Sequence, residues 1–183
     1  MVKVLALDVG FASLGWAAID AATGGVCCAG VIRTVKSQAK RGVRVADDDC
    51  RRCAEQALAL DALLARFNPA CVVAEVPTGG SLSARATRAM ALGTGIACGV
   101  LAVRGVPCEF TTPRDGKLAA TGNAGAGKPD VEAGVMHRVP GARALLDAAK
   151  RADREHISDA CAAWLVARGG QLVMMAARGG GAS

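Results

Sequence analysis

Two hydrophobic patterns alternate along the chain, one continuous and one with helical spacing. The continuous apolar runs predict buried β-strands over residues 2–8, 16–20, 26–34, 70–76 and 106–110. Short turns that contain glycine join the first three runs, which predicts an antiparallel meander. The fourth strand is entered from a helix, so we expect it to run parallel to a neighbour in a mixed sheet.

The periodic segments predict three long α-helices. Apolar positions recur with helical spacing over residues 47–67, 84–103 and 155–168. The acidic residues 47–49 favour the start of the first helix, and Pro69 follows its end. Gly93, Gly95 and Gly99 lower the helix propensity of the second, which indicates tight packing against a sheet or another helix.

The remaining segments are richer in polar residues, glycine and proline. They are a basic connection over 36–44, a turn-rich loop over 77–83, an irregular stretch over 111–131, a short helix over 130–136, a polar segment or short helix over 142–154, and a C-terminal segment over 171–183 whose Gly-rich tail we expect to be disordered. The order of elements predicts an α/β fold in one domain over residues 1–170, with helices flanking the mixed sheet.

The composition suits a core of small residues and a polyanionic partner. The chain has 183 residues, of which 52% are hydrophobic and only 3% aromatic, and it contains no tyrosine. Its core must therefore be built from Ala, Val and Leu, and Ala-rich helices can approach a sheet closely. The net charge of +6 favours polyanions such as nucleic acids, although charge alone equally allows an inert basic surface.

The eight cysteines and the first residues indicate a reducing compartment. No basic and apolar leader precedes the first strand, so we expect a cytoplasmic protein of a bacterium, a phage-infected cell or an organelle interior, not a secreted one. No apolar run reaches the ~18 residues of a membrane span. Cys50 and Cys53 have the spacing of half a zinc site, but no second pair follows, which disfavours structural zinc. The cysteines in apolar surroundings are interpreted as core residues: Cys27, Cys28, Cys71, Cys98 and Cys161.

Acidic side chains stand at the ends of buried segments. Asp8 ends the first apolar run and Glu75 ends the fourth. His156 and Asp159 lie three residues apart, on one face of the last helix. Either strand carboxylate alone could be an ordinary turn residue, but a carboxylate beside a buried strand is costly without a partner. If the strands are neighbours, the two carboxylates converge at one sheet edge, where the docked helix adds its two side chains.

This set of ligands predicts a site for divalent metal ions. Three carboxylates and one imidazole suit Mg²⁺ or Mn²⁺ better than a structural zinc. Two such ions about 4 Å apart are the usual clamp for phosphodiester hydrolysis, in which one activates a water and the other stabilises the leaving oxygen. His156 is either a direct ligand or the group that orients and deprotonates the water.

The sequence resembles the RuvC-type Holliday junction resolvases of the ribonuclease H-like superfamily. The matching stretches, in order, are LALDVGFASLGW (5–16), VIRT (31–34), VVAE (72–75), LG (92–93), TP (112–113), KLAATGNAGAGK (117–128) and HISDA (156–160). The resemblance implies a ribonuclease H-like fold and a homodimeric endonuclease of DNA recombination and repair. Such a crossover junction endodeoxyribonuclease nicks two strands of a four-way junction symmetrically.

The resemblance also assigns roles to individual residues. Asp8, Glu75, His156 and Asp159 match the family's ligands for two Mg²⁺ or Mn²⁺ ions, and the family allows either Asp or His at the position of His156. Among the predicted DNA contacts, Lys117 and Lys128 match basic positions of the family's DNA-contacting stretch, and Arg114 is an addition in this chain. The others come from basic segments that otherwise form a solvated face: Arg33, Lys36, Lys40, Arg41, Arg44, Arg85 and Arg88. No membrane partner and no nucleotide cofactor is expected.

The segment after Glu75 departs from the family pattern. The family carries a bulky apolar or aromatic residue there for the centre of the junction, whereas residues 76–83 are rich in glycine and offer only Leu82. In this respect the chain is similar to divergent phage-type members. The role of the family's wedge residue is therefore not transferred.

Two other kinds of function fit the same residues. A ribonuclease H-like nuclease could act on RNA or on other branched DNA, and a junction-binding protein could lack activity. The basic loops and the Ala- and Gly-rich segment 84–103, which suits a dimer, favour DNA junctions. Intact Asp8, Glu75 and Asp159 disfavour an inactive protein. The predicted reaction is in-line attack of water on the scissile phosphate, which leaves a 5′-phosphate.

Overall fold

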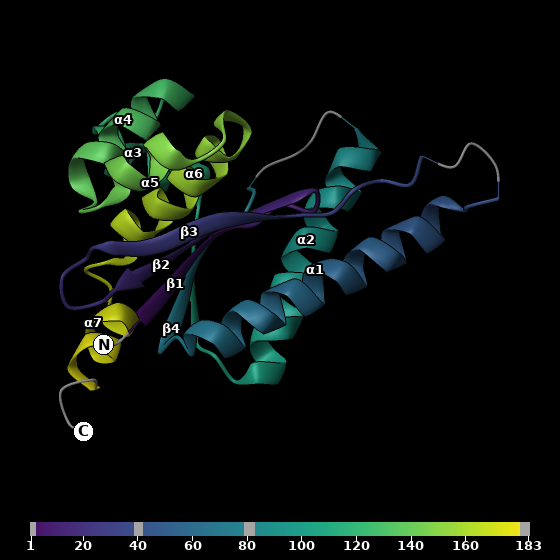
Figure 1. Cartoon of the computed structure of the whole chain (residues 1–183), viewed down its shortest axis with the longest axis horizontal. Coiled ribbons are helices and arrows are strands. Elements are labelled where there is room, and N and C mark those ends of the chain that lie inside the picture. Colours follow the sequence, from purple (N-terminus) through teal and green to yellow (C-terminus); the bar gives the residue numbers. More distant parts are fainter. Residues whose placement is uncertain (1–2, 39–41, 79–82, 180–183) are drawn as a thin grey trace.

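A five-stranded mixed sheet forms the centre of the protein. The computed structural model describes residues 3–38, 42–78 and 83–179 (Figure 1). The strands are β1 (Lys3–Asp8), β2 (Ser13–Asp20), β3 (Val26–Arg33), β4 (Cys71–Glu75) and β5 (Cys108–Thr111), in the spatial order β3-β2-β1-β4-β5. β1, β2 and β3 pair antiparallel, whereas β4 pairs parallel with both β1 and β5. The predicted meander, parallel crossover and α/β fold class are confirmed.

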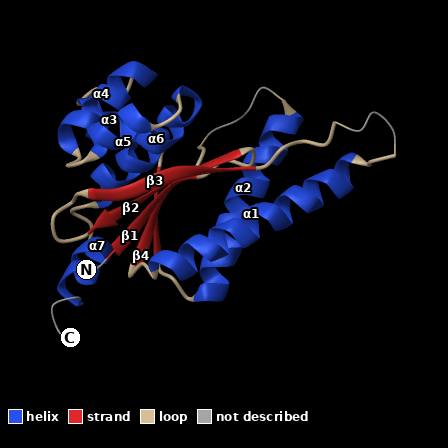
Figure 2. Cartoon of the chain, in the orientation of Figure 1, coloured by secondary structure: helices blue, strands red, loops and turns tan. Residues whose placement is uncertain are grey.

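Helices cover both faces of the sheet (Figure 2). They are α1 (Val45–Phe67), α2 (Ala84–Arg104), α3 (Pro113–Thr121), α4 (Lys128–Arg138), α5 (Ala142–Ala148), α6 (Arg151–Ala167) and α7 (Gln171–Gly179). In β1, Leu5 and Leu7 belong to the core shared with α1 and α2, whereas Val4 and Ala6 belong to the core shared with α4 and α6. Because both faces are buried, the strand reads as one continuous apolar run.

The structure corrects several boundaries. β2 begins at Ser13, before the predicted start, and α6 begins earlier at Arg151. α3 lies in the stretch that was expected to be irregular. Its start has the features of a helix N-terminus, because the hydroxyl of Thr112 accepts a hydrogen bond from the Asp115 backbone N–H (3.2 Å) and Pro113 begins the helix.

The C-terminal segment and the cysteines also differ from the predictions. Residues 171–179 form α7, whose Val173 is buried in the core, and the tail at 180–183 lies outside the described residues. Cys71 and Cys161 are buried as expected, but Cys27 and Cys98 are exposed. A local apolar pattern therefore predicted burial that the packing does not provide.

α2 leaves most of its surface uncovered. Gly93 packs tightly as predicted, since a Cβ atom there would lie 3.0 Å from the backbone nitrogen of Phe11. Gly95 and Gly99 would have no neighbour within 4 Å, so the prediction is wrong for them within a single chain. Contrary to expectation, α2 meets the length and hydropathy criteria of a membrane span (mean hydropathy 1.5). Only 17% of its apolar window is buried, unlike the core helix of a compact protein. An exposed apolar face of this kind also serves to bind another protein surface.

Gly15 allows α6 to lie directly on the sheet. This glycine pairs with Asp8 across β1 and β2. A Cβ atom at Gly15 would lie 2.2 Å from the backbone oxygen of His156, far inside any normal contact. The missing side chain therefore lets the first turns of α6 approach the carboxyl end of β1, which brings His156 and Asp159 to that edge of the sheet.

Replacement of Gly15 by alanine should push α6 away from the sheet. We expect Gly15→Ala to lower the free energy of unfolding by about 1–3 kcal/mol, the usual effect of overpacking. Gly169→Ala is the matched control, because a Cβ atom there would meet nothing within 4 Å. Chemical denaturation of both variants measures the difference, and equal stability of the two would contradict this account of the contact.

Candidate functional site

Three carboxylates converge at the carboxyl ends of β1 and β4. Asp8 and Glu75 are direct partners in the parallel pairing of these strands, and Asp159 reaches them from α6. One oxygen atom from each lies within 4.8 Å of the others. Glu75 is buried and the other two are half-buried. The structure thus brings together three of the four side chains predicted as metal ligands.

Burial and nearby like charges raise the pKa values of two of these groups, Glu75 and Asp159. Burial, with the nearby charges of Asp159 and Asp8, raises the pKa of Glu75 to about 8. Lys117 opposes this shift. Burial, with Asp8 as the largest neighbouring charge, raises the pKa of Asp159 to about 7. A bound cation would offset the opposition to ionisation at Glu75 and Asp159, so the donor set fits a divalent metal ion.

His156 is the partner of Asp8 in this arrangement. Its Nδ1 lies 2.8 Å from Oδ2 of Asp8, and this hydrogen bond is the largest cause of a raised pKa for the imidazole. The protonated ring supplies part of the positive charge that the carboxylates require. While Nδ1 bonds Asp8, Nε2 is the ring nitrogen that remains for another partner. Its predicted role as a metal ligand stays a prediction.

Arg33 links the start of α6 to the sheet through hydrogen bonds. Its guanidinium donates hydrogen bonds to the hydroxyl of Ser13 (2.8 Å), the backbone oxygen of Ala152 (2.8 Å) and the carboxylate of Asp153 (2.5 Å). Ser13 and Arg33 are direct partners in the pairing of β2 with β3. The side chain thereby orients the turn that precedes His156. Its predicted contact with DNA stays a prediction beside this observed structural role.

Two lysines line a small cavity at the carboxylates. The cavity has a volume of about 200 Å³, and Lys117 of α3 and Lys128 of α4 line it together with Glu75 and Asp159. Lys128 also forms an ion pair with Glu155. Amines placed here can attract a phosphate group to the carboxylates.

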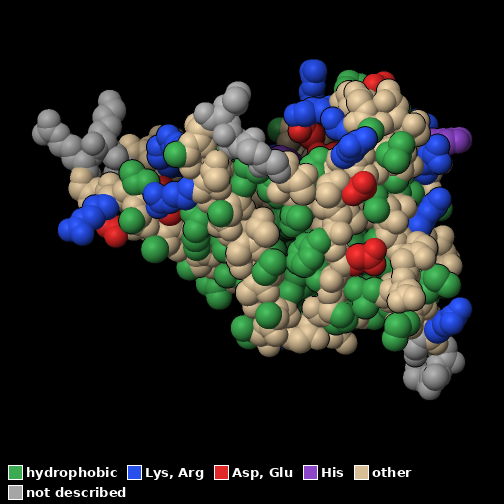
Figure 3. Space-filling view, turned by 180° about the vertical axis from the view of Figure 1, so that it is seen from behind, with side chains coloured by type: hydrophobic (Ala, Val, Ile, Leu, Met, Phe, Trp, Pro, Cys, Tyr) green, Lys and Arg blue, Asp and Glu red, His purple; other side chains and the backbone are tan. Residues whose placement is uncertain are grey.

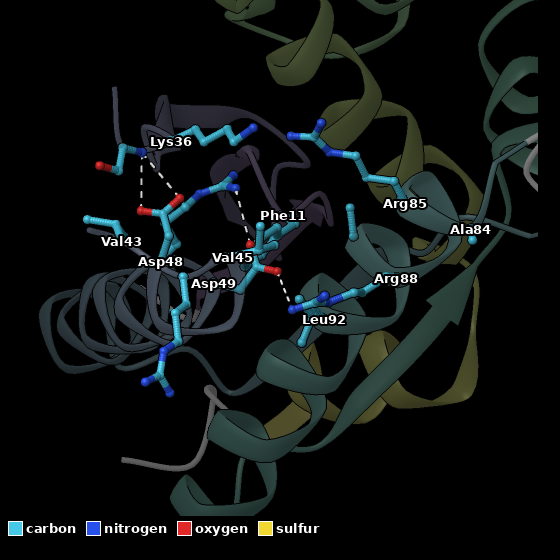
Figure 4. A pocket seen from close by; sticks show the side chains of 14 residues that line it. Phe11, Lys36, Val43, Val45, Asp48, Asp49, Ala84, Arg85, Arg88 and Leu92 are labelled. Atoms are coloured by element: carbon cyan, nitrogen blue, oxygen red, sulfur yellow. Dashed lines mark hydrogen bonds and ion pairs between the residues drawn. The ribbon is translucent and has the colours of Figure 1, made fainter. Parts of the chain in front are cut away.

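The other predicted DNA contacts lie in different places. Four of them line a second, larger pocket between α1 and α2: Lys36, Arg44, Arg85 and Arg88 (Figure 4). Arg114 is exposed on α3. Lys40, Arg41 and Leu82 lie outside the described residues. Contact of any of these side chains with DNA stays a prediction.

A polar network that supports the turn after Asp8 was not predicted. Gln56, which is buried in α1, donates a hydrogen bond to the backbone oxygen of Gly10 (2.6 Å). Arg52, one turn earlier, lies over the ring of Phe11 (4.2 Å) and donates to the hydroxyl of Thr34 (3.1 Å). That hydroxyl donates in turn to the backbone oxygen of Phe11 (2.8 Å). The sequence did contain a signal for this network, because Arg52 and Gln56 are polar residues four positions apart on the apolar face of the helix.

The comparisons with known proteins identify the fold. No family model and no curated protein matches the sequence. Among solved structures, RuvC of Thermus thermophilus in complex with a Holliday junction substrate has a TM-score of 0.70 and 20% identity, covering 91% of this chain and 92% of that chain. The same organism's RuvC in another structure has a TM-score of 0.67, 20% identity and coverage of 90% and 92%. The yeast mitochondrial Holliday junction resolvase Ydc2 has a TM-score of 0.62, 10% identity and coverage of 97% and 82%.

These structural neighbours are RuvC-type Holliday junction resolvases, so the resemblance expected from the sequence motifs is confirmed at the level of the fold. The mixed sheet flanked by helices is the ribonuclease H-like arrangement of RuvC. At 10% to 20% identity, the likeness establishes architecture, and the function of the site must be argued from its own residues.

Without divalent metal, the free energy of unfolding should fall as pH rises from about 5 to about 8. The pKa of Glu75 is raised from 4.5 to about 8, so the folded state binds this proton more tightly than the unfolded state does. That stabilisation is fully present below the unfolded pKa and is lost as pH approaches 8. Mg²⁺ or Mn²⁺ at pH 8 should restore stability. Chemical denaturation with and without metal measures both effects.

Two variants separate the contribution of Glu75 from other titrations. Glu75→Gln should reduce both the pH dependence and the stabilisation by metal, whereas Glu55→Gln, at an exposed position of α1, should leave both unchanged. Wild-type protein that becomes more stable between pH 5 and 8 without metal would contradict the account of Glu75.

Proposed function

We propose that this chain is a metal-dependent nuclease that resolves four-way DNA junctions by paired nicks, in DNA recombination and repair. One observation carries the proposal. It is the convergence of Asp8, Glu75 and Asp159 within 4.8 Å of one another, on a fold whose solved neighbours are RuvC-type resolvases. Hydrolysis of a phosphodiester is the chemistry that such a carboxylate cluster supports when it holds divalent ions.

The side chains of the cluster have distinct tasks in this reaction. The three carboxylates would hold Mg²⁺ or Mn²⁺, which supplies an activated water and neutralises charge at the scissile phosphate. Glu75 and Asp159, whose pKa values are raised, release their protons when a cation is bound. Once a bound cation replaces the positive charge of its ring, His156 would be neutral, with the Nδ1 proton directed to Asp8 and Nε2 able to accept the proton of the attacking water or to bind metal.

The lysines at the cavity hold the substrate during the reaction. Lys117 and Lys128 lie beside Glu75 and Asp159, where they bind the non-bridging oxygens of the scissile phosphate. Water attacks phosphorus in line with the bond to the 3′ oxygen. That bond breaks, the 3′ oxygen leaves and takes up a proton, and the product carries a 5′-phosphate. The exposed Arg114 on α3 extends the positive surface beside the site.

A homodimer would present two such sites to the two symmetric points of a junction. The face of α1 and α2 offers a surface for it. Val103 of α2 is 89% exposed and Leu58 of α1 is 70% exposed, and the open positions at Gly95 and Gly99 allow close approach of another helix. Figure 3 shows hydrophobic side chains gathered over this part of the molecule. We propose that two copies of α2 meet there.

Substrate selection is tested with a four-way junction, a linear duplex and an RNA hairpin in the presence of Mg²⁺ or Mn²⁺. We expect symmetric nicks in the junction and slow cleavage of the other two. Preferred cleavage of RNA would favour the alternative, a ribonuclease H-like nuclease of another substrate class. Binding without cleavage under all conditions would favour an inactive junction-binding protein.

Asp8→Asn should reduce junction cleavage at least about 100-fold and leave junction binding intact, because it removes one negative ligand but no cationic contact. Asp147→Asn is the matched control, since Asp147 is an exposed carboxylate on α5. Single-turnover cleavage and gel-shift titration measure the two properties. Cleavage that survives in Asp8→Asn would refute the assignment of the metal site.

Val103→Asp should weaken dimerisation about tenfold or more, because each subunit would place a charge in an apolar interface. Met175→Asp is the control, as Met175 is 70% exposed on α7, outside the proposed interface. Analytical ultracentrifugation over a range of concentrations measures both. Equal dimer affinity of the two variants would exclude this face as the interface.

A further inference from the structure

A pocket of about 540 Å³ lies on the side of the β1–β2 turn that faces α1 and α2. Its lining comes from that turn, from the segment before α1, and from the first turns of α1 and α2 (Figure 4). In the figure, the side chains of Lys36 and Arg85 extend toward one another across the pocket. The pocket is separate from the cavity at the carboxylates, since the two share no lining residue.

The pocket carries unpaired positive charge. Within the described part of the chain, no carboxylate is in ion-pairing distance of Lys36, Arg44 or Arg85. Both acids in the lining have cationic partners. Asp48 pairs with Arg51 (2.7 Å) and Asp49 pairs with Arg88 (2.6 Å). The three remaining cations select an anionic ligand.

The pocket also exposes apolar side chains beside these cations. Val43 is 46% exposed and Val45 is 64% exposed. The rest of the apolar lining comes from Phe11 and, on α2, from Ala84, Ala89 and Leu92. A phosphate group alone has no apolar part that could cover these side chains. A nucleotide has an anionic phosphate and an apolar base face, and proteins that hold unpaired strands combine basic and apolar surfaces in this way. The volume suits a small ligand and excludes a duplex.

The position of the pocket relates it to the cleavage site. Phe11, which lines it, follows Asp8 by three residues, so the two Cα atoms are at most about 11 Å apart. Nucleotides rise about 3.4 Å per step along one strand of a duplex, so the pocket lies within a few nucleotides of a phosphate held at the carboxylates. At a branch point the pairs are interrupted, and taking a base out of the stack costs least where pairing is already disturbed.

We propose that this pocket binds one unpaired nucleotide of the junction, close to the branch point. Its phosphate is held between Lys36 and Arg85, and its base lies against Val45 and Leu92. The inference rests on the proposed function and deepens it, because such a pocket would select branched DNA over a continuous duplex by the availability of an unstacked base.

The test places 2-aminopurine, a fluorescent analogue of adenine, at successive positions around the branch point of a four-way junction. Binding is followed with Asp8→Asn protein so that the DNA remains uncut. We expect fluorescence to rise at one position near the branch point and at none in the arms. Val45→Ser, at an exposed position, should lower this signal and leave the salt dependence of binding unchanged.

Charge variants test the phosphate contact separately. Arg85→Ala or Lys36→Ala should reduce the slope of log affinity against log salt by about 1, whereas Arg143→Ala, exposed on α5, should not affect the 2-aminopurine signal. A reduced slope without any fluorescence response would mean that the pocket holds a backbone phosphate only, and would overturn the inference. Junction binding with no response at any position would overturn it too. Failure to bind the junction at all would instead refute the proposed function.

Discussion

Repulsion among three partly buried carboxylates is the constraint around which this chain is arranged. Asp8, Glu75 and Asp159 lie close together, and burial and like charges both oppose the ionisation of Glu75 and Asp159. The two cores on either side of the sheet supply the free energy that holds them together. Part of the folding free energy therefore offsets the repulsion among the carboxylates, and a bound cation would relieve that repulsion.

The support for this site comes from both faces of the sheet. From one face, Gln56 of α1 holds the turn that follows Asp8. From the other, α6 rests on Gly15, and Arg33 ties the first turn of the helix to β2 and β3. The three carboxylates are therefore held in place by packing and by hydrogen bonds from residues outside the cluster. The same turn also borders the pocket between α1 and α2.

Much of the fold and the carboxylate cluster could be predicted because both depend on local patterns. Continuous apolar runs marked the strands, and a carboxylate at the end of such a run is conspicuous. α3 was missed because proline and glycine dominate its surroundings, although Thr112 and Pro113 form a regular helix start. The pairing of Arg33 with Asp153 joins residues far apart in the chain, so no local pattern contains it. From the sequence alone, Arg33 is therefore interpreted as a surface residue, and its contact with α6 becomes visible only in the structure.

The exposed face of α2 has a consequence for how the protein behaves on dilution. Val103 is 89% exposed, and only Gly93, Ala97 and Leu101 of this helix are buried within one chain. If two subunits cover this face in each other, folding and association are linked by mass action, and the melting temperature rises with protein concentration. A lone subunit would instead present a long apolar helix to water, so dilution itself would lower the stability of the protein.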